Sequence, residues 1–271
     1  MEIRKQLVEA IETLRHKRPL VHHITNYVTV NDCANVVLAI GASPVMADEE
    51  KEVEAMVSIC HSLVLNIGTA NERTLKAMIQ AGKMANRKNI PVLLDPVGIG
   101  ATPFRFESVQ RLLEEVKFSV IRGNMAEIKT IAGESSKSAG VDSLDDETDG
   151  GTIAKNLALK LGCVIAMTGK SDIVSNGHST YRLENGDFNL TKVTGTGCMT
   201  SSLIGSFLGS SNDALKSAIA GIWSMSIAGE IATYRLEKHQ GIGSFKVYLM
   251  DAINLMSGAV FKKFGKITLI K

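Results

Sequence analysis

The 271-residue sequence has no marked excess of charge of either sign, with 30 Lys and Arg residues against 28 Asp and Glu residues. Proteins that bind nucleic acids or anionic membranes usually gather a basic excess on one face or in one run. The longest basic stretches here are Arg15-His16-Lys17-Arg18 and Lys262-Lys263. The sequence therefore predicts neither a nucleic-acid nor a membrane partner.

Closely spaced cysteines are also lacking. Cys33, Cys60, Cys163 and Cys198 lie far apart, which argues against a disulfide framework and against a zinc site. We expect reduced thiols and a cytoplasmic protein. The first residues carry charges throughout and do not form the apolar core of a signal peptide, so export is not expected.

Long uncharged hydrophobic runs are missing as well. The most apolar long segment, Ala214 to Thr233, contains Lys216 and Glu230, and the span between them is shorter than the ~20 residues that cross a bilayer. We interpret this segment as a buried helix. With only 5 Pro and 45% hydrophobic residues, the composition is that of a packed globular protein, and we predict one domain over residues 1–271.

Short apolar runs of strand length alternate with amphipathic stretches of helical spacing. The runs are continuous rather than alternating in polarity, which is typical of parallel strands covered on both faces. The predicted strands are Pro19–Ile24, Leu63–Ile67, Pro91–Leu94, Phe118–Ile121 and Cys163–Met167, and the intervening helices are 52–60, 72–86 and 106–116. The fold class is α/β, with a central, mostly parallel sheet flanked by helices.

The pattern changes after Met167. The segments 173–175, 179–183 and 188–190 alternate in polarity and are separated by Asn176-Gly177 and Asn185-Gly186, which are strong hairpin signals. We expect an antiparallel hairpin at one edge of the sheet. From Cys198 to Met256 the sequence is predominantly helical. The polar stretch 133–151 is expected to be a surface loop.

The most distinctive local feature is Gly195-Thr196-Gly197-Cys198, where two glycines immediately precede a helix. Backbone N–H groups can converge there, and the helix start adds partial positive charge, so an anion can bind. A tight turn with a helix cap explains the same residues equally well. Because Cys198 stands at this electropositive helix start, the pKa of its thiol should be lowered.

Two further groups of polar residues follow predicted strands. Asp95 stands at the carboxyl end of an apolar run, where a charge needs solvent, a cation or a ligand, although an Asp before Pro96 also initiates turns. Asn124 and Glu127 are spaced as in a helix capping box, and they are also suited to a magnesium ion held largely through water. Both interpretations remain open for these residues.

Together these residues resemble the hydroxyethylthiazole kinases, a ribokinase-like family of thiamine salvage, over essentially the whole chain. Three blocks carry the resemblance. They are 23–29 with 34–46, then Asp95-Pro96-Val97-Gly98 with Arg122-Gly123-Asn124 and Glu127, and finally Gly195-Thr196-Gly197-Cys198.

The resemblance implies ATP-dependent phosphorylation of the hydroxyl of 4-methyl-5-(2-hydroxyethyl)thiazole, with Mg²⁺, on a ribokinase-like fold. It also implies a homotrimer with the substrate site at a subunit boundary. By position, Met46, Gly195, Asn26 and Gly68 are expected to contact the thiazole, and Arg122 and Thr168 to bind ATP. Cys198, with Gly195, Thr196 and Gly197, is expected nearest the reacting hydroxyl, and Glu127, Asn124 and Asp95 near the metal.

Two alternatives belong to other classes. One is another ribokinase-like enzyme, such as a small-alcohol kinase or an ADP-forming repair dehydratase. In that wider superfamily an Asp usually occupies the position of Cys198, which counts against it. The other is a nucleotide-binding regulatory protein without activity.

Overall fold

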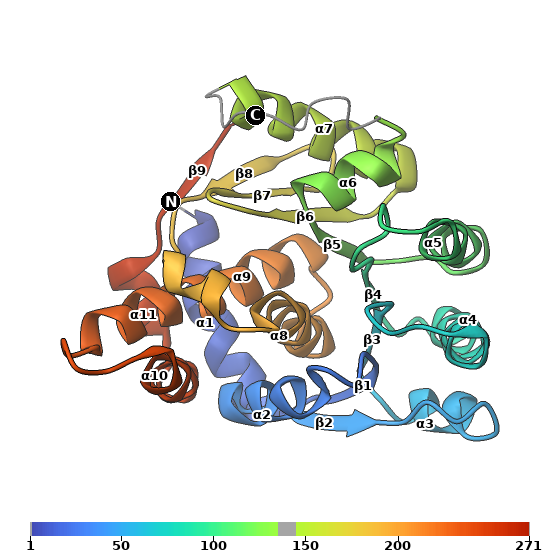
Figure 1. The fold of residues 1–271 in the computed structure, drawn as a ribbon, viewed down its shortest axis with the longest axis horizontal. Coiled ribbons are helices and arrows are strands. Elements are labelled where there is room, and N and C mark those ends of the chain that lie inside the picture. Colours follow the sequence, from blue (N-terminus) through green and yellow to red (C-terminus); the bar gives the residue numbers. More distant parts are fainter. Residues whose placement is uncertain (1, 135–144, 271) are drawn as a thin grey trace.

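The structure, a computed structural model, describes residues 2–134 and 145–270. It contains a nine-stranded sheet with the order β2-β1-β3-β4-β5-β6-β7-β8-β9 (Figure 1). The strands from β2 to β6 in this order run parallel, and the last three are antiparallel to their neighbours. Their bounds are β1 Leu20–Ile24, β2 Ser43–Met46, β3 Ser62–Asn66, β4 Val92–Asp95, β5 Val120–Asn124, β6 Val164–Thr168, β7 Asp172–Ser175, β8 Thr180–Leu183 and β9 Ile267–Leu269.

Helices cover both faces of this sheet, as Figure 1 shows. One face carries α1 Glu2–Lys17, α2 Val30–Ile40, α8 Thr196–Ser210, α9 Ala214–Arg235, α10 Ile242–Asn254 and α11 Gly258–Phe264. The other carries α3 Val53–Ser58, α4 Glu72–Arg87, α5 Pro103–Glu115, α6 Met125–Ala132 and α7 Asp145–Leu161. The predicted α/β class, with a mostly parallel sheet and an antiparallel edge, is confirmed.

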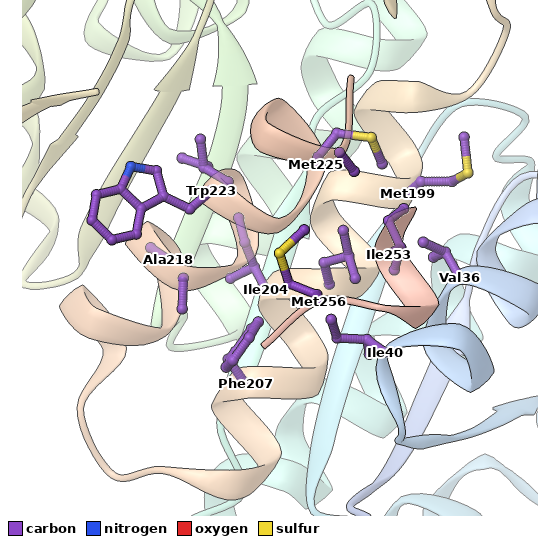
Figure 2. Close-up of a cluster of buried hydrophobic side chains, with 14 of the residues drawn as sticks. Val36, Ile40, Met199, Ile204, Phe207, Ala218, Trp223, Met225, Ile253 and Met256 are labelled. Carbon is purple, nitrogen blue, oxygen red and sulfur yellow. The ribbon is translucent and has the colours of Figure 1, made fainter. Parts of the chain in front are cut away.

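Each face of the sheet has its own hydrophobic core, because alternate residues of a strand point to opposite sides. In β3, Val64 belongs to the core under α8, whereas Leu63 and Leu65 belong to the core under α4. Figure 2 shows part of the first core, to which Ile204 and Phe207 of α8 and Trp223 of α9 all belong. This packing fixes α8 firmly against the sheet.

Helix α9 is buried along most of its length, as predicted for Ala214 to Thr233. Its buried residues include small ones such as Gly221, where an added Cβ would lie 2.6 Å from the backbone nitrogen of Ile204 in α8. The two helices therefore pack in close contact. Within the described ranges 2–134 and 145–270, we find no helix with the length and apolarity needed to span a membrane.

One sequence prediction needs correction in the region after β6. Residues 188–190 were expected as a strand, but they lie in η1, a 3-10 helix over Phe188–Lys192. The Asp187 side chain accepts a hydrogen bond from the Asn189 amide (2.8 Å), and this local bond turns the chain out of the extended conformation. The β7–β8 hairpin with Asn176-Gly177 at its turn is confirmed.

The predicted loop 133–151 is shorter than expected at its carboxyl side, because α7 already begins at Asp145. Residues 135–144 lie outside the described part of the chain. Two edge elements of the sheet, β2 and β9, were not predicted. Both are short, and the strand β2 is only half-buried, so neither leaves a continuous apolar run in the sequence.

The carboxyl ends of the parallel strands meet at one edge of the sheet, where α/β proteins bind their ligands. The last residues of β3, β4, β5 and β6 are all polar: Asn66, Asp95, Asn124 and Thr168. Asn66 is paired with Asp95 across β3 and β4, and Asn124 is paired with Thr168 across β5 and β6. Helix α8 packs against β1, β3 and β4. Its first turn therefore lies beside this edge.

Candidate active site at the carboxyl edge of the sheet

The first turn of α8 has backbone N–H groups with no partner among the described residues. Gly195 is the N-cap and has a left-handed backbone, with φ of 90°. It provides no side-chain cap, and the first bond within the turn runs from the Met199 amide to the Gly195 carbonyl (2.8 Å). The amides of Thr196, Gly197 and Cys198 donate to no other described residue, so they are available to an anion.

Neighbouring side chains leave room only for glycine at positions 195 and 197 of this turn. A Cβ on Gly195 would lie 2.6 Å from Cγ2 of Thr29, in addition to the cost of a positive φ. A Cβ on Gly197 would lie 2.7 Å from Nη1 of Arg122, so the guanidinium group rests directly on the backbone of the turn. The turn can therefore bring its amides and a cation to the same place.

Arg122 reaches this position from β5, and its side chain is only 12% exposed. Its Nη2 donates to Oγ1 of Thr168 (2.6 Å), and its Nη1 lies 3.7 Å from Oδ2 of Asp95. The buried Nε has no partner among the described residues. A buried donor without a partner is costly, so the guanidinium group is suited to an additional acceptor such as a phosphate.

The environment of Cys198 contradicts the expected lowering of its pKa. Sγ accepts hydrogen bonds from Nδ2 of Asn26 and Nδ2 of Asn66, both at 3.3 Å. Burial nevertheless raises the pKa of the thiol, and the negative charge of Asp95 raises it further. The helix-start argument considered only local charge, whereas desolvation and the neighbouring carboxylate dominate here.

Asp95 is fully buried at the end of β4. Its Oδ2 accepts from Nδ2 of Asn66 (2.9 Å) and from Oγ of Ser201 (2.7 Å), whereas Oδ1 has no partner among the described residues. Burial raises the pKa of this carboxyl to about 6, opposed by the charge of Arg122 and assisted by that of Glu127. One oxygen of this buried carboxyl group is therefore available to a cation or a water molecule.

Asn124 and Glu127 form a capping box at the start of α6. The Asn124 side chain accepts from the Glu127 amide (2.9 Å), and Oε2 of Glu127 accepts from the Asn124 amide (2.8 Å). Oε1 of Glu127 accepts from the amide of Gly98, in the loop after β4 (2.9 Å). The capping role is confirmed, and it holds the Glu127 carboxylate beside the end of β4.

One pocket is lined by the first turn of α8, and a second lies near it. The larger, of about 680 Å³, is lined by Arg122, Thr168, Thr196 and Gly197, and it continues to apolar side chains such as Ile222 and Met225. The smaller, of about 290 Å³, is lined by residues from β1, β2 and β3 and from α4, including His23, Met46, Asn66, Tyr27 and Met78. Cys198 is linked to the second pocket through its hydrogen bond with Asn66.

Asn26 and Gly68, the other two residues predicted to contact the thiazole, lie near this turn. Asn26 uses its side-chain oxygen to accept from the amide and the hydroxyl of Thr29, and its Nδ2 donates to Asn66 and Cys198. The Gly68 amide donates to Oδ1 of Asn66 (2.9 Å), and its carbonyl accepts from Arg105 (2.7 Å). Asn26 therefore contacts Cys198 and Gly68 is connected to it through Asn66, but the polar groups of both residues are already paired within the protein.

Two residues of the site were missed in the sequence. Asn66 interrupts the apolar run Leu63 to Ile67 and is the last residue of β3, and a polar residue at the carboxyl end of a buried strand was the signal that could have found it. Asp172 begins β7 and lines the larger pocket. Burial raises its pKa to about 7, against hydrogen bonds from the amide of Gly169 (3.0 Å) and the hydroxyl of Ser226 (3.2 Å).

Comparison with protein families matches residues 11–258 to the hydroxyethylthiazole kinase family. The chain belongs to this family. The hydroxyethylthiazole kinase of Alkaliphilus oremlandii is 56% identical over 268 residues, covering 98% of this chain and 99% of the relative. That of Clostridium beijerinckii is 51% identical over 271 residues, covering 98% of each chain.

Solved structures agree with the family and define the fold. The hydroxyethylthiazole kinase of Pyrococcus horikoshii superposes with a TM-score of 0.90 at 36% identity, covering 98% of this chain and all of that one. The pyridoxal kinase of Staphylococcus aureus in complex with AMP-PCP superposes with a TM-score of 0.66 at 14% identity, covering 93% and 98% of the two chains. The second likeness shows that the hydroxyethylthiazole kinase family shares its fold with pyridoxal kinase.

Proposed function

We propose that this protein transfers the γ-phosphoryl group of ATP to the hydroxyl of 4-methyl-5-(2-hydroxyethyl)thiazole. Membership of the family supports the reaction, and one observation carries its location. The free amides of Thr196, Gly197 and Cys198 lie beside the larger pocket next to Arg122, and Cys198 is bonded to Asn66, which lines the smaller pocket beside Met46. A phosphoryl group passing from one pocket to the other would meet these amides.

The larger pocket is suited to ATP. Its inner end presents the guanidinium group of Arg122, the hydroxyl of Thr168 and the amides of the first turn of α8, which are all groups that bind phosphate. Its other walls include the apolar side chains of Leu190, Ile222 and Met225. The polar groups would hold the phosphates, and the apolar walls would accommodate the base.

The smaller pocket is suited to the thiazole alcohol. Met46 and Met78 line it, and thioether side chains make favourable contacts with aromatic rings. Gly68, beside Asn66, and Gly195, at the start of α8, lie near this pocket without lining it. Asn26 does not line this pocket, but its side chain bonds to Asn66, which does, and to Cys198, so we assign it to the support of the pocket and not to direct contact.

The residues present also fit Mg²⁺. The unpaired, buried Oδ1 of Asp95 is an available oxygen donor, and Glu127 is held nearby by the α6 cap. Within residues 2–134 and 145–270 there is no cluster of three or more His, Cys, Asp or Glu side chains that could enclose a metal ion, so most ligands would be water and phosphate oxygens, as Mg²⁺ prefers. Asn124 would contribute by positioning Glu127. When bound, the ion would neutralise charge on the phosphates.

The chemistry does not require a strong base. An aliphatic hydroxyl has a pKa of roughly 15 to 16, near that of water, so Cys198 would not deprotonate it before attack. Phosphoryl transfer passes mostly through a loose transition state, in which the proton leaves late and positioning and charge neutralisation dominate. A neutral thiol, as the raised pKa of Cys198 favours, can orient the hydroxyl in such a reaction.

The protein should act as a homotrimer with the substrate pocket at a subunit boundary. In support, the side chain of Tyr27, which lines the smaller pocket, is 78% exposed, and neighbouring Val28 is 59% exposed. Apolar surface of this kind beside a pocket is typical of an interface. Val28→Lys should shift the molar mass measured by light scattering from that of a trimer to that of a monomer and weaken binding of the thiazole alcohol.

Two further properties of the chain fit this function. All four cysteines are free thiols, which supports a reducing, cytoplasmic setting. The continuous nine-stranded sheet supports one kinase domain over residues 1–271.

A coupled assay of ADP release with and without the thiazole alcohol tests the proposal. We expect release that depends on the alcohol and on Mg²⁺. A nucleotide-binding regulatory protein would bind ATP and release no ADP with any alcohol. Faster release with another alcohol, or only with a damaged nicotinamide nucleotide, would instead favour a different ribokinase-like enzyme.

A further inference from the structure

The side chain of Asn66 connects the carboxyl group of Asp95 to the thiol of Cys198. Its Nδ2 donates both to Oδ2 of Asp95 (2.9 Å) and to Sγ of Cys198 (3.3 Å). Its Oδ1 accepts from Nδ2 of Asn26 (3.0 Å) and from the amide of Gly68 (2.9 Å). The side chain is only 2% exposed, and both its donors and both its acceptor sites are used. Its orientation is therefore determined completely by the protein.

Asn26 completes the network around the sulfur atom. Its Nδ2 donates to Sγ of Cys198 (3.3 Å), while its Oδ1 accepts from the amide and the hydroxyl of Thr29, both at 3.0 Å. Two amide N–H groups from β3 and from the segment after β1 thus converge on one sulfur atom. The thiol is held from two directions, although α8 itself provides only its backbone attachment.

We propose that Asn66 is a positioning residue for phosphoryl transfer, which holds the thiol of Cys198 in the orientation that the reacting hydroxyl needs. This inference rests on the function proposed above. Asn66 reaches the reaction through Cys198 and does not itself need to touch a substrate. Misplacement of a reacting group by about 1 Å can cost on the order of 10²-fold in rate. A side chain that fixes the position of the thiol should therefore have a measurable effect on kcat.

A purely structural role for Asn66 is the rival explanation, because the same side chain also bonds to buried Asp95. A double-mutant cycle separates the two roles. Asn66→Ala is measured in the wild-type protein and in the Cys198→Ala background. Ser201→Ala is the matched control, because the Ser201 hydroxyl donates to the same oxygen of Asp95 (2.7 Å) and has no bond to Cys198.

We expect Asn66→Ala to lower kcat by about 10-fold to 10²-fold in the wild-type background, with the KM for ATP unchanged. In the Cys198→Ala background the same substitution should change kcat by no more than about twofold, because its target is gone. Ser201→Ala should lower kcat by the same factor in both backgrounds. Equal factors for Asn66→Ala in both backgrounds would overturn the inference.

Asn66→Asp provides the same test if Asn66→Ala does not fold, with thermal unfolding as the check. The carboxyl group has the shape of the amide and can share a proton with Asp95, but it loses the donor to the sulfur atom. We expect the same dependence on Cys198. Wild-type ADP release with the thiazole alcohol tests the proposed function alone, so equal factors in an active enzyme would contradict only the role of Asn66.

Discussion

Two helices begin at the carboxyl edge of the sheet, and they differ in whether the backbone amides of their first turn have hydrogen-bond partners. Helix α6 is closed by its own side chains, because Asn124 and Glu127 accept from each other's amides. Helix α8 begins at Gly195 without a side-chain cap, and the amides of Thr196, Gly197 and Cys198 donate to no described residue. A helix start that is capped positions a side chain, whereas one that is left open can bind an anion.

The open helix start should show the largest effect. Gly197→Ala places a Cβ 2.7 Å from Nη1 of Arg122, and the guanidinium group must move away from the turn. We expect kcat/KM to fall by about 10²-fold or more, the cost of losing one well-placed donor. The free energy of unfolding should change little, because a flexible side chain can yield and Ala favours a helix over Gly.

Gly241→Ala is the control for this variant. Gly241 is the N-cap of α10, and an added Cβ there would meet nothing within 4 Å. Steady-state kinetics of both variants should show a large loss only for Gly197→Ala. Equal kinetics for the two variants would mean that the start of α8 has no special role.

Replacement of the thiol should have a smaller effect than disturbance of the amides. Cys198→Ala should slow transfer by about tenfold to 10²-fold without abolishing it, because the proton leaves late. Cys198→Asp should retain activity, because the N–H groups of Asn26 and Asn66 can donate to a carboxylate. An Ala variant that binds both substrates but shows no turnover in the ADP assay would contradict the late-proton account.

Substitutions at the capped start of α6 should change the stability of the protein and its requirement for Mg²⁺. Asn124→Ala removes the cap of α6 and should lower the free energy of unfolding by about 1 kcal/mol. Glu127→Gln should raise the Mg²⁺ concentration needed for half-maximal activity, because it removes a charge held beside Asp95. Urea unfolding and a Mg²⁺ titration measure the two effects. An unchanged titration would leave Glu127 with its capping role alone.

The smallest expected effect concerns Asp172 in the wall of the larger pocket. Burial raises its pKa to about 7 in the folded protein, above the ordinary value of 3.8. The folded state therefore binds a proton that the unfolded state has released between pH 4 and pH 7, so the stabilising contribution of the protonated group is lost as the pH rises through this range.

Asp172→Asn removes this dependence. The melting temperature of the wild type, measured relative to that of the variant, should fall by at least about 2 °C between pH 4 and pH 7, which corresponds to roughly 1 kcal/mol. The comparison between variants cancels the opposite contribution of His23, whose pKa burial lowers to about 4. A constant difference across this pH range would contradict the assignment.

The sequence was most informative where local pattern and tertiary position coincide. Asp95 follows a continuous apolar run, and such a run is a buried strand whose carboxyl end faces the ligand edge. The glycines of Gly195-Thr196-Gly197 were identified for a similar reason, because glycine before a helix is a local signal. The parallel strands and the Asn176-Gly177 hairpin were predicted in the same way.

The sequence was least informative where the outcome depends on distant neighbours. The pKa of Cys198 was predicted in the wrong direction, since burial and the charge of Asp95 come from other elements. The bonds of Asn66 join residues 29, 40 and 132 positions away in the chain, and no local pattern encodes them. The strand expected at residues 188–190 is instead a 3-10 helix, because the side chain of Asp187 accepts from the amide of Asn189 and the carbonyl of Asp187 accepts from the amide of Leu190.

The most direct test of the account is a crystal structure with ADP, Mg²⁺, the thiazole alcohol and a planar fluoride mimic of the transferring phosphoryl group. We predict that the mimic accepts hydrogen bonds from the amides of Gly197 and Cys198 at about 2.7–3.1 Å. A mimic bound away from α8, with those amides still free, would contradict the account.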